Sequence, residues 1–135
     1  MIEAHYMNND AMPVNVWVLA ALSISFAVAA QLLMKIGMTA LRMAGRLDSL
    51  SIETAWEILL QPAVFFGLAS YGVSAALWLL VLSRMPLSMA YPLISLGILA
   101  VVLLSVFALG ENVSAGRAAG VAFIVAGVFL IGFYR

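Results

Sequence analysis

Long apolar runs alternate with short polar segments along this chain. A helix needs about 20 residues to cross the hydrocarbon core of a bilayer, and several of these runs reach that length. We predict membrane-spanning helices at about 14–39, 62–83, 87–109 and 114–134. The pattern therefore indicates an all-α, polytopic membrane protein, in which residues 1–135 form a single four-helix transmembrane domain.

The segment between the first two predicted spans, RLDSLSIETAWEILLQ, mixes charged residues with large apolar ones. Its composition favours a short amphipathic helix that lies at the membrane interface. Thr54 and Glu57 have the spacing of a capping box, in which Thr54 would be the N-cap. A plain loop is the alternative.

Composition excludes several classes of protein. The 135 residues are 66% apolar and 9% charged, whereas soluble domains have about 25% charged residues. The absence of cysteine excludes disulfides and thiolate metal sites, and the zero net charge provides no basic surface for nucleic acid. We find no glycine-rich phosphate loop, no His/Cys cluster and no nucleophile–base pair. The sequence therefore predicts no enzyme, no cofactor and no metal site.

The third predicted span carries a polar stripe around an internal proline. Ser88, Tyr91 and Ser95 fall at positions i, i+3 and i+7, so their hydroxyls share one helix face. Pro92 has no amide hydrogen for the carbonyl of Ser88, so we expect the helix to bend there. A freed carbonyl should face protein, water or a polar ligand rather than lipid. These residues are candidates for substrate binding; a kink used only for helix packing is the alternative.

The second predicted span has a similar stripe of Gly67, Tyr71, Ser74 and Trp78. Such a stripe either lines a cavity or makes a helix–helix contact. We include its aromatic members, Tyr71 and Trp78, among the candidate substrate-binding residues.

Near the end of the first predicted span, Gln31 and Lys35 lie one helical turn apart on one face, and Lys35 is the only lysine of the protein. A lysine at this depth either snorkels to the interface or holds an anion at the mouth of a cavity. We take Lys35 and Gln31 as a candidate site for a phosphate.

Carboxylates are missing from the predicted spans. A transporter that exchanges protons for cationic drugs needs a carboxylate within the membrane. Glu111 is a candidate only from a loop, where a solvated turn residue is the alternative. In the fourth predicted span, Gly116, Gly120 and Gly127 allow close helix approach, and we predict that they form a dimer interface.

Several segments resemble, in their order and spacing, the four-helix form of the drug/metabolite transporter superfamily. They are AAQLLMK (29–35), LWLLVLSRMPLSMAYPLISLG (77–97), GEN (110–112) and GVAFIVAGVFLIG (120–132). The small multidrug resistance exporters of this superfamily carry an essential membrane carboxylate at the position of Ala27. The sequence is more similar to the small subunits of the 4-amino-4-deoxyarabinose-phosphoundecaprenol flippase, which share WLLVL, GVAFI and the spacing of Gln31 and Lys35.

The resemblance implies a flippase of the bacterial inner membrane that moves a polyprenyl-phosphate-linked sugar. It also implies a homodimer, or a heterodimer with a similar four-helix subunit. We expect Lys35 and Gln31 to meet the phosphate, and Ser88, Tyr91 and Ser95 to meet the sugar hydroxyls. Two alternatives stay open: an exporter of cationic or amphipathic small molecules that uses Glu111 or a partner's carboxylate, and a subunit without transport activity.

Overall fold

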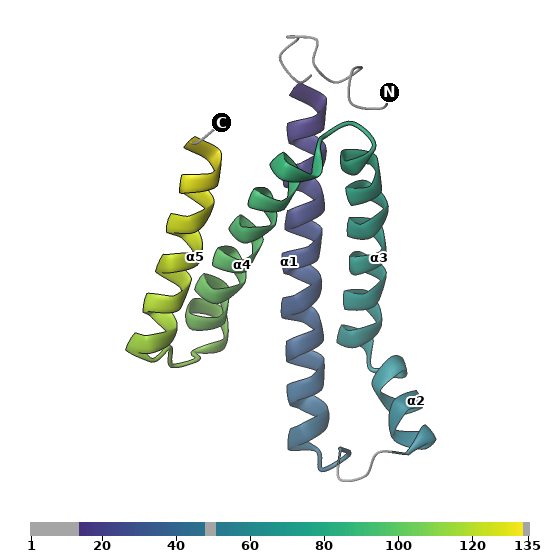
Figure 1. Cartoon of the computed structure of the whole chain (residues 1–135). Helices are drawn as coiled ribbons and strands as arrows, with labels where there is room; N and C mark the ends of the chain where they lie inside the picture. The colour runs from purple at the N-terminus through teal and green to yellow at the C-terminus, as the bar shows by residue number, and fades with distance from the viewer. Residues whose placement is uncertain (1–13, 48–50, 134–135) are drawn as a thin grey trace.

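The computed structural model describes residues 14–47 and 51–133. Within these two stretches the chain forms helices and no strand, so the predicted all-α class is confirmed. The helices are α1 (Val14–Met43), α2 (Ile52–Leu60), α3 (Pro62–Leu82), α4 (Leu87–Leu109) and α5 (Ala115–Phe133). α1, α3, α4 and α5 run alternately up and down, and α2 lies at the end where α1 stops (Figure 1).

The long helices coincide closely with the predicted spans. α1, α3 and α4 are long and apolar enough to cross a bilayer, and Ala115–Leu130 of α5 is a shorter apolar stretch. α1 continues beyond residue 39 to Met43, where Gly45 adopts a positive φ of 68° and stops the helix. Residue 134, the predicted end of the last span, lies outside the described residues.

The segment between the first two predicted spans contains the short helix α2 and is not a plain loop. The predicted capping box is wrong. Ser51 is the N-cap, and its Oγ accepts a hydrogen bond from the amide of Thr54 at 3.2 Å. Thr54 therefore lies inside the first turn, because the helix begins at Ile52. Arg46 Nη1 lies 3.9 Å from Glu57 Oε2, which links the end of α1 to α2.

α1 and α3 form the tightest helix pair. A Cβ atom on Gly67 would lie 3.0 Å from the carbonyl oxygen of Ala30, and one on Gly37 would lie 3.0 Å from the amide nitrogen of Val64. These two glycines let the backbones approach. In the same interface, Ser23 Oγ donates to the carbonyl of Ser74 at 2.9 Å, and Ser74 Oγ donates to the carbonyl of Ser23 at 2.8 Å.

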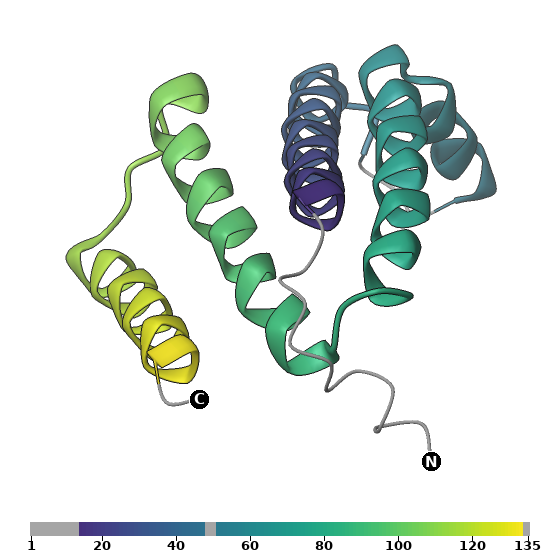
Figure 2. The same ribbon diagram turned by 90° about the horizontal axis from the view of Figure 1, so that it is seen from above.

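α4 and α5 diverge from this pair. The first turns of α4 pack onto α1 and α3 in a small core of Val16, Ala20, Val81, Met85 and Ala90. α4 then diverges from α1, and α5 runs back alongside α4 (Figure 2). Among the described helices, α5 contacts α4 alone. The fold is therefore a closed α1–α3 pair with an α4–α5 arm attached at one end.

Candidate functional site

Two adjoining cavities occupy the wedge between α1 and the α4–α5 arm. The larger has a volume of about 600 Å³ and is lined by α1, α4, α5 and the loop between α4 and α5. The smaller, of about 380 Å³, is lined by α1, α3 and α4. They share the wall residues Val28, Gln31, Val101 and Val102, so a ligand in one lies next to the other.

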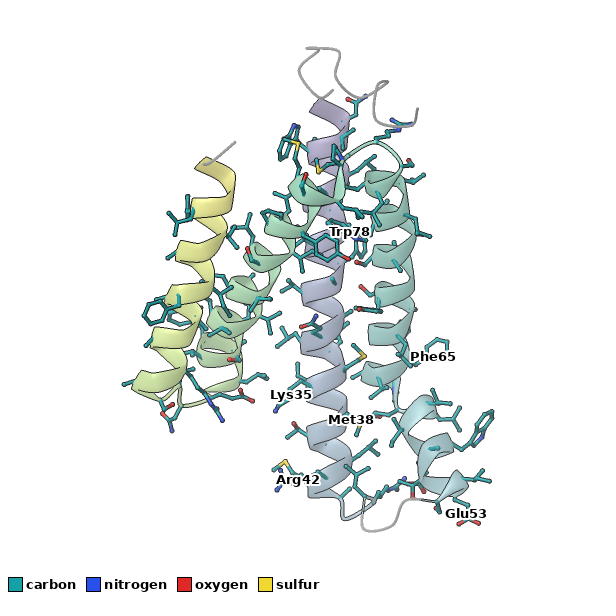
Figure 3. The ribbon with its side chains drawn as sticks, viewed as in Figure 1. Lys35, Met38, Arg42, Glu53, Phe65 and Trp78 are labelled. Atoms are coloured by element: carbon teal, nitrogen blue, oxygen red, sulfur yellow. The ribbon has the colours of Figure 1, made fainter. Side chains whose placement is uncertain are left out.

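Charged side chains gather in the larger cavity, whose lining is otherwise mostly apolar. Lys35, Glu111 and Arg117 all line it. Lys35 Nζ lies 2.9 Å from Glu111 Oε1, and the two side chains are 55% and 41% exposed in the isolated chain. Figure 3 shows Lys35 on the side of α1 that faces α4 and α5. This ion pair joins α1 to the arm where the two have diverged.

The loop between α4 and α5 places Glu111 and Arg117 through its two helix caps. Gly110 ends α4 with a positive φ of 64°, and the amide of Glu111 donates to the carbonyl of Ser105 at 3.0 Å. At the other end, Ser114 Oγ accepts from the amide of Arg117 at 3.4 Å, as an N-cap of α5 does. Both charged residues are therefore held by backbone geometry at the cavity.

The structure brings together Gln31, Lys35 and Glu111. The sequence suggested the first two for phosphate binding and Glu111 for cation export. The pairing of Lys35 with Glu111 and the presence of Arg117 were missed. The order of the spans could have predicted the pairing. The first and third predicted spans end on the same side of the membrane, so Lys35 and the GEN segment lie at a similar depth. Glu111 is thus an ion-paired residue of the cavity as well as a turn residue.

The stripe on α3 divides between both expected uses. Gly67 and Ser74 make the contact with α1, whereas Tyr71 and Trp78 line the smaller cavity. Ala27 lines the same cavity. It is the residue that the sequence comparison matched to the carboxylate of the small multidrug resistance exporters. The smaller cavity therefore has a mostly aliphatic wall, to which Tyr71 and Trp78 add aromatic rings, and residue 27 is apolar.

The stripe around Pro92 lies apart from the charged site. Neither cavity is lined by Ser88, Tyr91, Pro92 or Ser95, and Tyr91 is 63% exposed. Ser95 is buried and its Oγ donates to the carbonyl of Pro92 within α4. α4 instead presents the neighbouring positions Ile94, Gly97 and Ile98 to the smaller cavity. Substrate binding by the four residues stays a prediction.

The glycines predicted for a dimer interface have no packing use in the described part of the chain. A Cβ atom on Gly116, Gly120 or Gly127 would meet nothing within 4 Å. Gly120 lines the larger cavity. These positions contrast with Gly37 and Gly67, where α1 and α3 already use the space.

Comparison with known proteins finds relatives along most of the chain. A protein of Erwinia tasmaniensis described as a probable 4-amino-4-deoxy-L-arabinose-phosphoundecaprenol flippase subunit ArnF is 40% identical over 81% of this chain and 87% of its own length. The subunit of the same name from Proteus mirabilis is 38% identical over 85% of this chain and 88% of its own. An ArnE subunit from Pectobacterium atrosepticum is 43% identical over 44% of this chain and 53% of its own.

No protein-family model matches the chain, and no solved structure matches it. The assignment to a family therefore rests on the two ArnF relatives, which match more than four fifths of this chain and of their own length. With its long apolar helices, this is a multi-pass membrane protein. The chain belongs to the family of ArnE and ArnF flippase subunits.

Proposed function

We propose that this protein is one subunit of a flippase that moves 4-amino-4-deoxy-L-arabinose-phosphoundecaprenol across the bacterial inner membrane, with no chemical step. The observation that carries the proposal is the 40% identity to a subunit named for this lipid over most of both chains. A charged cavity in an otherwise apolar helical protein supports it, because a flippase must shelter only the polar headgroup. The polyprenyl tail stays in lipid.

In this proposal α1, α3, α4 and α5 are the four spans, and α2 lies at the membrane interface. α5 is the shortest of the four, but its composition is as apolar as that of a span. α2 leaves Ile52, Trp56 and Leu60 largely exposed, which suits a helix that rests its apolar side chains in the headgroup region.

The headgroup phosphate binds at Lys35, with Gln31 one helical turn farther into the cavity. Both line the larger cavity, and Gln31 also lines the smaller one. An ammonium in a mostly apolar site attracts a phosphate more strongly than it would in water. Tyr71 and Trp78 then offer ring faces and a hydroxyl to the sugar.

A second four-helix subunit completes the transporter. The relatives carry two subunit names, ArnE and ArnF, which supports a heterodimer. α5 packs against α4 alone among the described helices, and its glycines are open. A partner seated on α5 would close the wedge from the lipid side.

The test measures flipping of the aminoarabinose lipid in vesicles that contain this chain and its companion subunit. An amine reagent that does not cross the membrane reports the fraction of lipid in the outer leaflet. We expect Lys35→Ala to reduce flipping at least about tenfold, since it removes a charge-assisted contact. Arg42→Ala is the matched control, because Arg42 is an exposed cation of α1 that lines neither cavity.

If vesicles with both subunits do not move this lipid, the proposed function is wrong. If Lys35→Ala and Arg42→Ala behave alike, the phosphate assignment is wrong. Release of protons on addition of a quaternary cation, lost in Glu111→Gln, would instead establish the exporter. The structure gives Glu111 a lysine partner at 2.9 Å and places Ala27 at the cavity wall, so neither position offers an unpaired carboxylate for exchange.

A further inference from the structure

We propose that Glu111 forms an amine subsite in the larger cavity, and that Lys35 and Arg117 together form its phosphate subsite. A zwitterionic headgroup would then take the place of the Lys35–Glu111 ion pair. This inference rests on the proposed function, and it names the residue that selects an amino sugar over a neutral one.

The charged side chains that line the larger cavity suit a zwitterionic headgroup. The lining of the larger cavity holds the cations Lys35 and Arg117 and the single anion Glu111 among the described residues. A phosphate that engages Lys35 removes the cation that now neutralises Glu111. Glu111 would then stand beside a mostly apolar cavity wall without the cation that stabilises its charge. A protonated amine on the same headgroup would supply the missing partner.

The positions of these three residues also suit such a headgroup. Lys35 projects from α1, Glu111 lies in the loop between α4 and α5, and Arg117 lies in the first turn of α5. A headgroup in this cavity therefore meets a cation from α1, a cation from α5 and a carboxylate from the loop. Ser105 and Asn112 line the same region and add hydrogen-bonding groups for sugar hydroxyls.

Selectivity follows from this geometry. A polyprenyl-phosphate sugar that carries a hydroxyl in place of the amine would still bind Lys35 and Arg117, but it would leave Glu111 without a cation. Hydrogen bonds to charged groups are strong enough that losing one lowers affinity about tenfold or more. The amine, rather than the phosphate, would then distinguish the transported lipid from other polyprenyl-phosphate sugars.

The experiment is a competition measured by native mass spectrometry on the full chain with its companion subunit. The probes are two short-chain polyprenyl-phosphate lipids at equal concentration, one carrying 4-amino-4-deoxyarabinose and the other arabinose. We expect the wild type to retain the aminated lipid about tenfold over the hydroxylated one. Glu111→Gln should bring this ratio close to one while still binding both lipids.

Lys35→Gln is the matched control, because it breaks the same ion pair from the other side. We expect it to weaken both lipids equally and to keep the preference for the amine. Any general effect of losing the pair would appear in both variants. Glu57→Gln, which removes the carboxylate that faces Arg46, should change neither quantity.

Loss of the preference in Glu111→Gln alone supports the amine subsite. A wild type that binds both lipids equally overturns it, and so does a Glu111→Gln variant that keeps the preference; in both cases the proposed function stands. If the wild type binds neither lipid, the proposed function fails and the amine subsite fails with it.

Discussion

Gly67 is one of two glycines, with Gly37, that let α1 and α3 pack closely. A methyl group there would lie 2.7 Å from Met34 Cγ, which can move, but also 3.0 Å from the carbonyl oxygen of Ala30, which cannot. We therefore expect Gly67→Ala to force the two helices apart and to destabilise the protein by about 1–3 kcal/mol. Unfolding in mixed micelles would measure the loss.

The control for this substitution lies on the same helix. A Cβ atom on Gly72 would meet nothing within 4 Å, so Gly72→Ala should be neutral or slightly stabilising because alanine favours the helix. Equal destabilisation by both variants would contradict this explanation, because Gly72 has no close contact and helix propensity favours alanine at both positions.

Ser23 and Ser74 form a reciprocal clamp in the same interface. Each hydroxyl donates to the other residue's carbonyl, and the two Oγ atoms are 3.3 Å apart. Hydrogen bonds between membrane helices contribute about 0.6 kcal/mol on average and up to about 1.7. We expect Ser23→Ala and Ser74→Ala each to destabilise the protein within that range, and the double variant to lose less than their sum.

Ser25→Ala provides the comparison, since the exposed Ser25 hydroxyl donates to the carbonyl of Ala21 in its own helix. Its expected effect on the free energy of unfolding is less than about 0.5 kcal/mol. An additive double variant of Ser23 and Ser74 would mean that the two hydroxyls act independently.

At the scale of the elements, α2 is an amphipathic helix with its apolar side chains unburied. Trp56 is 63% exposed, and Ile52 is 90% exposed. If α2 rests at the membrane interface, lipids brominated near the headgroup should quench Trp56 fluorescence more than lipids brominated near the chain end. The measurement uses a variant with Trp17→Phe and Trp78→Phe, so that Trp56 alone emits. If water-soluble iodide quenches Trp56 and neither brominated lipid does, α2 lies in solvent.

Hydropathy predicted the long helices well because each element's apolar run also sets its length. The N-cap of α2 was harder to predict: Ser51 rather than Thr54 caps the helix, and both have hydroxyls that suit an N-cap. The ion pair of Lys35 with Glu111 depends on where α4 ends relative to α1. No local spacing encodes that position, because it follows from how α4 leaves the core near Ala90 and diverges. Ser88, Tyr91 and Ser95 have the spacing of one helix face, but none of them lines either cavity; α4 presents Ile94, Gly97 and Ile98 to the smaller one instead.

The glycine face of α5 is where assembly should occur. Gly116, Gly120 and Gly127 are spaced for one helix face and have no neighbour within 4 Å of an added Cβ. In a bilayer such a small-residue face is used by another helix, since lipid tails gain nothing from it. A companion subunit seated there would also wall the larger cavity beside Gly120.

Gly127→Leu tests this assembly without touching either cavity, because Gly127 lines neither. A leucine should hold the partner helix away, and we expect association with the companion subunit to fall about tenfold, equivalent to about 1.4 kcal/mol. Chemical cross-linking in membranes measures the paired fraction. Gly72→Leu is the control, since Gly72 is equally open but lies on α3. If Gly127→Leu pairs as well as the wild type while Gly72→Leu does not, the partner binds α3, and the cavity beside Gly120 must be closed by lipid alone.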